Sequence, residues 1–444
     1  MTQAKMTEGP VRAHLIALTI PMIWGILAMM MFNIADTWFV AKLGDVQLAA
    51  MSFTFPVIMV LISLGIGLMA GTASVLSRVI GAGDKKLMQQ LTTDAALLSL
   101  LLSLIFSVIG LLTIDPLFRL LGADDEVLPL IREYMVVWYG GFVVFLVPMV
   151  GLGAVRATGD SKLQGRIMVA SAIINLILDP LLIFGWFGFP RLEIQGAAIA
   201  SVIARAMTFV VGFWALHYQK RMLTYEWPTL SRIFKSWKQV LHVGLPAAGT
   251  NMIIPLAIGV ITAMIARHGA EAVAGFGAAT RIEQVTLVVF FAMSATIGPF
   301  MGQNLGAGKP ERIVEAYQLS VRFCLWFGFL IALILALSAR VLMQQFSDDE
   351  QVIAAGLAFL WIVPISFGAQ GIIMNINAAF NGLGRPLPAV VISVVRMIGL
   401  YLPLALIGSY WLDIHGIFAA ACFANIGAAA LAYFWYRKVC IGLI

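Results

Sequence analysis

Two aspartates, an asparagine and a serine lie inside segments that are otherwise almost entirely apolar. Asp36 lies near the end of the apolar segment 14–41, about 8 Å deep at the helical rise of about 1.5 Å per residue. Asn175 and Asp179 are separated by one helical turn in the segment 163–187, so a helix places them on one face. Ser201, in the segment 194–218, reaches a similar depth. We therefore expect separate helices to bring these four side chains to one level.

Two carboxylates at such a depth could bind and release a cation. Burial and mutual repulsion both favour the protonated form of one of them, so the pair can share a proton and titrate as a unit. An ionisable group in hydrocarbon costs roughly 2.5–3.5 kcal/mol on insertion scales, which makes each one a functional candidate. A structural hydrogen-bonded cluster is the alternative. We favour a site for H⁺, or for Na⁺ held by oxygens of Asp36, Asn175, Asp179 and Ser201.

The neighbours of Asp36 could belong to a substrate cavity. Helical spacing places polar neighbours on its face, and the adjoining methionine and phenylalanine give soft apolar surface that would suit apolar cations. Ordinary packing is the alternative for the apolar pair. Pro21, in the same segment, removes a backbone hydrogen bond and is the best candidate for a hinge. The candidate cavity residues are Asn33, Thr37, Met31 and Phe32.

Other charged residues within apolar segments are also candidates. Arg281 and Glu283 lie in the segment 272–302 and either line the cavity or pair with neighbours. Arg205 lies deep in the segment 194–218 and could pair with a carboxylate of the first half of the chain. Arg396 is expected near a membrane surface, where its side chain can extend to water.

The elements that must position these groups are membrane-spanning helices. Hydrophobic residues make up 61% of the chain and charged residues 11%, whereas a soluble domain carries about 25% charged residues. Backbone amides in lipid must be satisfied within the segment, which predicts helices. Stretches long enough to span a bilayer occur twelve times, at 14–41, 48–77, 91–114, 127–156, 163–187, 194–218, 239–267, 272–302, 315–340, 351–381, 388–410 and 413–436.

The sequence repeats with an offset of 225 residues. Pro21 aligns with Pro246 and Gly83 with Gly308, whereas Asp36 aligns with Ile261. The repeat predicts two pseudo-symmetric six-helix lobes at 1–218 and 239–444, joined by a polar cytoplasmic linker at 219–238. Internal repeats of this kind are typical of secondary transporters. Asn175 and Asp179 also align with leucines, Leu400 and Leu404, so the acidic site is expected in the first lobe alone.

The basic residues predict the orientation. If the N-terminus is inside, eighteen Lys and Arg residues lie at inner ends and loops against six at outer ones, which predicts that both termini are cytoplasmic. The net charge of +6 is therefore explained by the orientation of the chain in the membrane, and no nucleic-acid partner is expected. We expect no cleavable signal peptide, three free thiols, no metal or other cofactor, and no enzyme, because no catalytic motif lies at depth.

Together these residues resemble the multidrug and toxic compound extrusion (MATE) family, in its bacterial DinF-like branch. The resemblance covers the whole chain, and its order and spacing are specific. The residues that carry it are Pro21 with Asp36-Thr37, Arg156-Ala157-Thr158-Gly159-Asp160, Asn175 with Asp179-Pro180, Gly196-Ala197-Ala198 with Ser201, and Ala279-Thr280-Arg281-Ile282-Glu283.

The resemblance implies export of cationic, amphipathic drugs, and hence antibiotic resistance, from the inner membrane in exchange for H⁺ or Na⁺. It assigns coupling to Asp36, Asn175, Asp179 and Ser201, and implies that protonation of Asp36 bends its helix at Pro21. The NorM-like branch keeps an acid in the helix at 239–267, and this chain has none. A lipid-linked oligosaccharide flippase of the same superfamily is the alternative. We expect a monomer in contact with membrane lipid.

Overall fold

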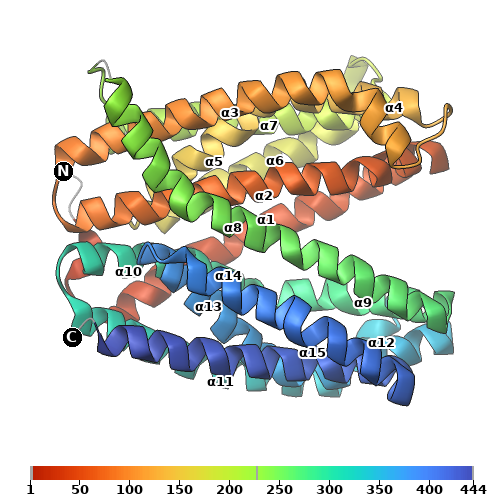
Figure 1. The fold of residues 1–444 in the computed structure, drawn as a ribbon. Coiled ribbons are helices and arrows are strands. Elements are labelled where there is room, and N and C mark those ends of the chain that lie inside the picture. Colours follow the sequence, from red (N-terminus) through yellow and green to blue (C-terminus); the bar gives the residue numbers. More distant parts are fainter. Residues whose placement is uncertain (1–3, 227–228, 443–444) are drawn as a thin grey trace. The chain divides into compact units, whose positions relative to one another are not determined.

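The computed structural model describes residues 4–226 and 229–442, and within these ranges every regular element is helical (Figure 1). Short 3₁₀ and π segments join some of the helices. The longer helices of the first half are α1 (Val11–Ala41), α2 (Asp45–Gly81), α3 (Lys85–Leu120), α4 (Leu128–Gly140), α5 (Phe142–Ala157), α6 (Ser161–Phe184), α7 (Glu193–Trp214) and α8 (Leu230–Ile265). Those of the second half are α9 (Ala270–Thr286), α10 (Val288–Gly306), α11 (Pro310–Met343), α12 (Glu350–Ile362), α13 (Phe367–Gly382), α14 (Pro386–Val394) and α15 (Leu402–Ile441).

The described helices form twelve spans. Ten are long and apolar enough to cross a membrane, and the pair α4–α5, bent by 47°, forms an eleventh. Helix α15 contains a break at Leu412 and Asp413. A methyl group on Gly408 would lie 2.5 Å from the carbonyl oxygen of Gly416, although eight residues of straight helix would separate the two by about 12 Å. The chain therefore folds back at this break, which supplies the twelfth span.

The repeat is visible in where the helices begin and end. Helix α2 begins at Asp45 and α9 at Ala270, which is the offset of 225 residues seen in the sequence. The turns repeat as well, because Gly83 has φ +78° and its counterpart Gly308 has φ +66°. Only glycine adopts this left-handed conformation readily. The predicted duplicated frame is thus confirmed at the level of individual turns.

Contacts divide the chain into two compact units. The first holds residues 1–5 and 20–248, and the second holds residues 6–19 and 249–444. The sequence division was 1–218 and 239–444 with a linker at 219–238, but α8 begins at Leu230, so the end of that linker is helical. Residues 227–228 of the linker lie outside the described residues.

Polar contacts explain why the start of α8 belongs to the first unit. Asp94 of α3 is fully buried and accepts hydrogen bonds from Ser236 Oγ (2.7 Å) and Arg232 (3.1 Å). The indole of Trp237 donates to the backbone oxygen of Asp94 (2.8 Å). Breaking such a buried charge pair leaves an uncompensated charge, so this cluster fixes α8 to α3.

The start of α1 belongs to the second unit for a similar reason. Arg312 of α11 donates to the backbone oxygens of Gly9 (2.7 Å) and Met6 (3.1 Å). Thr19 and Thr296 of α10 share a hydrogen bond of 3.3 Å. The boundary between the units therefore runs through α1 between Thr19 and Ile20, next to Pro21.

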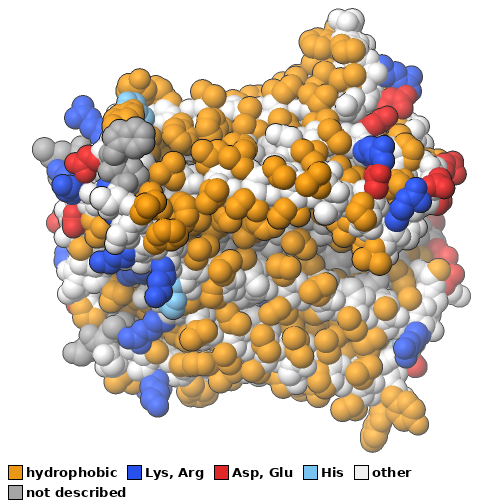
Figure 2. Space-filling model, turned by 45° about the horizontal axis from the view of Figure 1, so that its top comes forward, with side chains coloured by type: hydrophobic (Ala, Val, Ile, Leu, Met, Phe, Trp, Pro, Cys, Tyr) orange, Lys and Arg blue, Asp and Glu red, His pale blue; other side chains and the backbone are white. Residues whose placement is uncertain are grey.

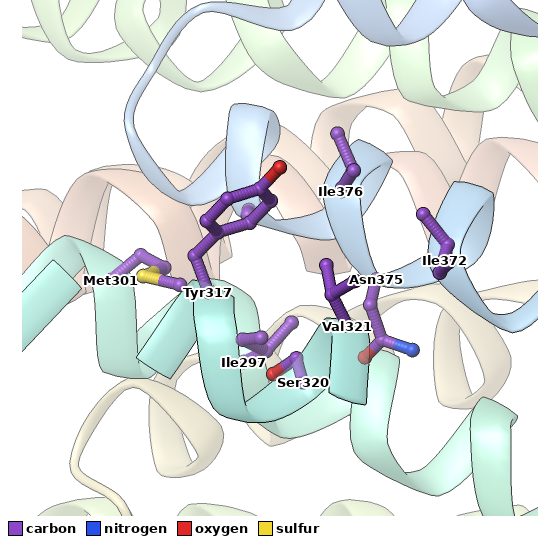
Figure 3. Close-up of a pocket in the computed structure, with 9 residues that line it drawn as sticks. Ile297, Met301, Tyr317, Ser320, Val321, Ile372, Asn375 and Ile376 are labelled. Atoms are coloured by element: carbon purple, nitrogen blue, oxygen red, sulfur yellow. The ribbon is translucent and has the colours of Figure 1, made fainter. Parts of the chain in front are cut away.

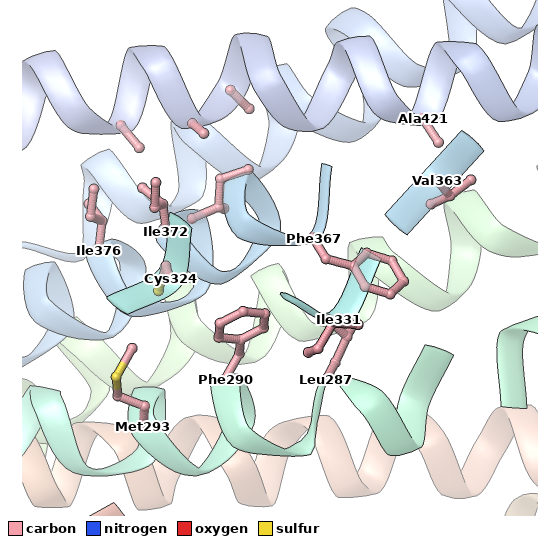
Figure 4. Close-up of a cluster of buried hydrophobic side chains, with 14 of the residues drawn as sticks. Leu287, Phe290, Met293, Cys324, Ile331, Val363, Phe367, Ile372, Ile376 and Ala421 are labelled. Carbon is pink, nitrogen blue, oxygen red and sulfur yellow. The ribbon is translucent and has the colours of Figure 1, made fainter. Parts of the chain in front are cut away.

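Both the cores and the outer surface are apolar. In the second unit, Phe290, Ile331 and Phe367 from α10, α11 and α13 pack together (Figure 4). On the face shown in Figure 2, hydrophobic side chains cover the middle of the helices and charged side chains gather at helix ends. The exposed apolar side chains, including Trp24, Leu112 and Phe329, are those expected of helices that face lipid.

The pair Asp160–Lys220 outside the spans gives a pH-dependent prediction. Asp160 caps α6 by accepting from the Leu163 N–H (3.1 Å), and Lys220 Nζ lies 2.5 Å from its other oxygen. Burial alone would raise the pKa of Asp160, but these hydrogen bonds and the charges of Lys220 and Lys5 hold the pKa below its ordinary value. The stabilisation is therefore full above the unfolded-state pKa and lost as the pH falls through the lower folded-state pKa.

Asp160→Asn keeps a capping side chain and removes the charge. We expect it to lower stability at neutral pH by no more than about 1 kcal/mol, with the difference shrinking as the pH falls below the ordinary aspartate pKa of about 3.9. Thermal unfolding in detergent measures this. Asp84→Asn is the matched control, because Asp84 caps α3 in the same way without a salt bridge to a lysine. An equal loss in both variants, or a loss independent of pH, would contradict the role of Lys220.

Candidate functional site

Asp36 is buried inside the first unit. Its side chain is 6% exposed, and Phe32 and Val40, one helical turn to either side, are also buried. Among the described residues, its oxygen Oδ1 has no hydrogen-bond partner. A buried carboxylate oxygen without a donor is costly, so this group is suited to take up a proton or a metal cation.

Asn175, Asp179 and Ser201 form the predicted network. Asp179 is fully buried, and the other two are nearly so. With its amide oriented to satisfy its neighbours, Asn175 donates to Asp179 Oδ2 (2.9 Å) and accepts from Ser201 Oγ (3.2 Å) and the Ser201 N–H (3.1 Å). Helices α6 and α7 pack along each other, which places Ser201 beside the α6 pair. The Asn175 amide therefore links Ser201 of α7 to the Asp179 carboxylate through hydrogen bonds.

Electrostatic interactions join Asp36 to this network. The two carboxyl groups are close enough to act on each other, and the phenol of Tyr134 on α4 interacts with both of them. Sequence reasoning missed Tyr134. A polar aromatic residue within the apolar segment 127–156 was the available signal. Helices α1, α4, α6 and α7 thus supply one cluster in which a proton on one carboxyl group changes the field at the other.

Arg205 lies beside the same cluster. Its guanidinium carbon is 4.4 Å from the ring centre of Phe145 and 5.7 Å from that of Trp138. It interacts electrostatically with Asp36. The expected ion pair with a carboxylate is not formed, because none of the salt bridges among the described residues includes Arg205.

The predicted cavity residues on α1 point in different directions. Phe32 is buried with Asp36, whereas Asn33, Thr37 and Met31 are exposed. Asn33 donates to the Met29 carbonyl (2.8 Å), and Thr37 donates to the Asn33 carbonyl (3.0 Å). Asn33 and Thr37 therefore lie on a part of the α1 surface next to that of Asp36. Only the part that carries Asp36 is buried in the unit.

Pro21 lies within continuous helix. Helix α1 runs through it, and α6 packs closely against this point, since a methyl group on Gly165 would lie 2.4 Å from the Pro21 carbonyl oxygen. A groove of about 440 Å³ runs beside this contact, lined by Pro21, Trp24, Lys162 and Arg166 among others. Space beside a proline in a helix permits a bend.

The second unit holds no counterpart of Asp36, because Ile261 is a buried apolar residue at that position. Its charged group is different: Glu283 of α9 is hydrogen-bonded to Gln370 and interacts with Arg396. Arg396 Nε donates to Asn425 Oδ1 (2.8 Å). The prediction that Arg396 extends to a membrane surface is wrong, because the π-helix Val395–Tyr401 directs it to Asn425 of α15 instead.

Arg281 and Glu283 separate in the structure, since Arg281 is exposed. Deeper in the second unit, a space of about 10 Å³ is bordered by Ser320 and Asn375 (Figure 3). Ser320 Oγ and Asn375 Oδ1 have no partner among the described residues. That volume is about the size of one water molecule, so the space is too small for a cargo.

Comparison with known proteins places the chain in a family. The MatE family model matches residues 21–181 and 246–407, two stretches related by the offset of 225 residues. A FAD transporter of Shewanella oneidensis is 40% identical over 98% of this chain and 96% of its own length. The "Probable multidrug resistance protein YoeA" of Bacillus subtilis is 26% identical over 89% of this chain and 87% of its own.

Solved structures agree with this relation. The bent form of the Vibrio cholerae MATE transporter VcmN is 32% identical, with a TM-score of 0.91 and 97% of each chain covered. The family model covers most of the chain, and these relatives match it over most of their own lengths. This chain therefore belongs to the MatE family of membrane transporters.

Proposed function

We propose that the protein is an antiporter that couples the uptake of a cation, most simply a proton, to the export of organic compounds. The observation that carries this proposal is the buried Asp36 Oδ1, which lacks a donor and belongs to a carboxyl group that interacts with Asp179. The protein would lie in a bacterial inner membrane with both termini in the cytoplasm, as the distribution of basic residues predicts.

Proton uptake has a direct physical consequence at this cluster. A proton on Asp36 supplies the missing partner of its oxygen and removes the repulsion between the two carboxylates. Asn175 then stabilises the charge that remains on Asp179 through its donated hydrogen bond. Because α1 carries Asp36 within the first unit while residues 11–19 belong to the second, a change at Asp36 can bend α1 near Pro21 and so alter the access of cargo.

The cargo is proposed from the relatives. The first candidate is amphipathic, cationic drugs, since one relative is named a probable multidrug resistance protein. A second candidate is a flavin dinucleotide, favoured by the 40% identity to a protein named as a FAD transporter. Both candidates offer apolar surface, which is compatible with the exposed Met31 on α1 and with the adaptable contacts that methionine makes.

Sodium is the alternative coupling ion. Carboxylate, amide and hydroxyl oxygens of Asp36, Asn175, Asp179 and Ser201 are ligands of the type that hard cations bind. In the structure, the Asn175 oxygen already accepts from Ser201. Sodium would have to displace these hydrogen bonds, whereas a proton on Asp36 leaves them intact, which favours the proton.

We expect Asp36→Asn to reduce gradient-driven efflux to below about a tenth of the wild-type rate, because an amide cannot release a proton. Efflux from everted vesicles or liposomes measures this. Asp45→Asn removes an exposed carboxylate at the start of α2 and should leave efflux unchanged. Wild-type efflux by a correctly folded Asp36→Asn protein would refute a coupling role for this residue.

The coupling ion can be identified in liposomes with an imposed pH gradient and no sodium. We expect addition of cargo to dissipate the gradient, since each transport cycle moves protons in the opposite direction. Liposomes carrying Asp36→Asn serve as the control. A gradient that stays intact until sodium is added would assign the site to Na⁺.

Pro21→Ala restores a backbone donor and should stiffen α1. We expect the transport rate to fall several-fold while equilibrium binding of cargo stays within about twofold. Pro116→Ala, in α3, is the control for removing a proline from a helix of the same unit. If Pro21→Ala transports at the wild-type rate, bending at this residue is not part of the cycle.

A further inference from the structure

Arg205 is a cation in the middle of a membrane span. It lies on α7, within the apolar span Glu193–Gln219, and more than ten residues from either end. A guanidinium at such a depth is costly even on insertion scales, at roughly 2.5–3.5 kcal/mol. An ionisable residue at such a depth is therefore a candidate functional residue, and the group that pairs with its charge indicates its function.

No group among the described residues neutralises Arg205 directly. Across residues 4–226 and 229–442, the structure records neither a hydrogen bond nor a salt bridge for its guanidinium, which instead lies over the rings of Phe145 and Trp138. These rings are themselves buried. Arg205 is partly exposed. It also lies one helical turn from Ser201, on the same face of α7.

The charge of Arg205 is balanced only at a distance. Asp36 on α1 interacts with it electrostatically, Asp179 on α6 completes the carboxylate cluster, and the neighbouring residues Tyr134 of α4 and Phe145 of α5 are uncharged. None of these groups occupies the donors of the guanidinium, so an anionic group of a cargo can bind them.

We propose that Arg205 is the subsite that binds the anionic group, a phosphate, of an aromatic cargo. The inference rests on the proposed function, because it assumes that this cluster handles cargo as well as protons. A guanidinium presents five donors in a planar fork that matches phosphate oxygens. Phe145 and Trp138 hold this fork by stacking on it. Arg205 is thus a specificity-determining residue that selects anionic over neutral and cationic aromatic compounds.

Equilibrium binding to the purified full-length protein tests this inference. The probes are flavin adenine dinucleotide, riboflavin, which keeps the ring without phosphate, and ethidium, which is an aromatic cation. We expect Arg205→Gln to weaken binding of the dinucleotide at least about tenfold and to change riboflavin binding by less than about twofold. Arg205→Lys keeps a point charge, so its affinity for the dinucleotide should lie between those of the wild-type protein and Arg205→Gln. Arg322→Gln, an exposed arginine of α11, is the matched control.

Several results would overturn the inference. The wild-type protein could bind the dinucleotide and riboflavin with equal affinity, or fail to bind the dinucleotide. Arg205→Gln could also lose affinity for both ligands to the same extent. Gel filtration and thermal unfolding establish that each variant is folded, and Arg205→Lys provides a second test if Arg205→Gln is not. Failure of the proposed function can be told apart from failure of this inference. If only the proposed function fails, Asp36→Asn still transports, while selectivity for the dinucleotide still depends on Arg205.

Discussion

A carboxylate oxygen buried without a donor is the constraint on which this structure depends. Asp36 Oδ1 has no partner among the described residues, and the hydrocarbon around the spans provides no water to replace one. The neighbouring groups do not remove this cost: Asn175 is engaged with Asp179 and Ser201, and Arg205 lies over aromatic rings. We propose that a transferable cation is the remaining partner, whose arrival or departure changes the balance of charge across four helices.

The duplicated frame explains how such a costly site is tolerated. Both halves share helix boundaries and left-handed glycines at the same offset, so the backbone is specified twice. The second unit places apolar Ile261 where the first has Asp36 and satisfies its own buried charges internally, through Glu283, Arg396 and Asn425. One unit can therefore be stable and charge-balanced while the other carries the unbalanced charge that chemistry needs.

The fold and half of the site could be predicted from the sequence, because helix periodicity and apolar length determine them. Asn175, Asp179 and Ser201 meet as expected, since helical spacing and depth fix their positions. Tyr134 was missed because its role depends on how α4 packs, which spacing does not encode. Arg396 was misplaced because a π-helical turn, absent from any regular periodicity, redirects it. The start of α8 was assigned to a linker because its polar residues contact the buried Asp94 rather than water.

Infrared difference spectroscopy of the purified protein tests the central claim most directly. Shifting the pH across neutrality should produce the carbonyl band of a protonated carboxylic acid, and this band should disappear in Asp36→Asn while the Asp45→Asn protein keeps it. Binding of a cationic cargo should suppress the band at fixed pH. A spectrum in which Asp36 stays ionised at every pH that the folded protein tolerates, with or without cargo, would contradict the account.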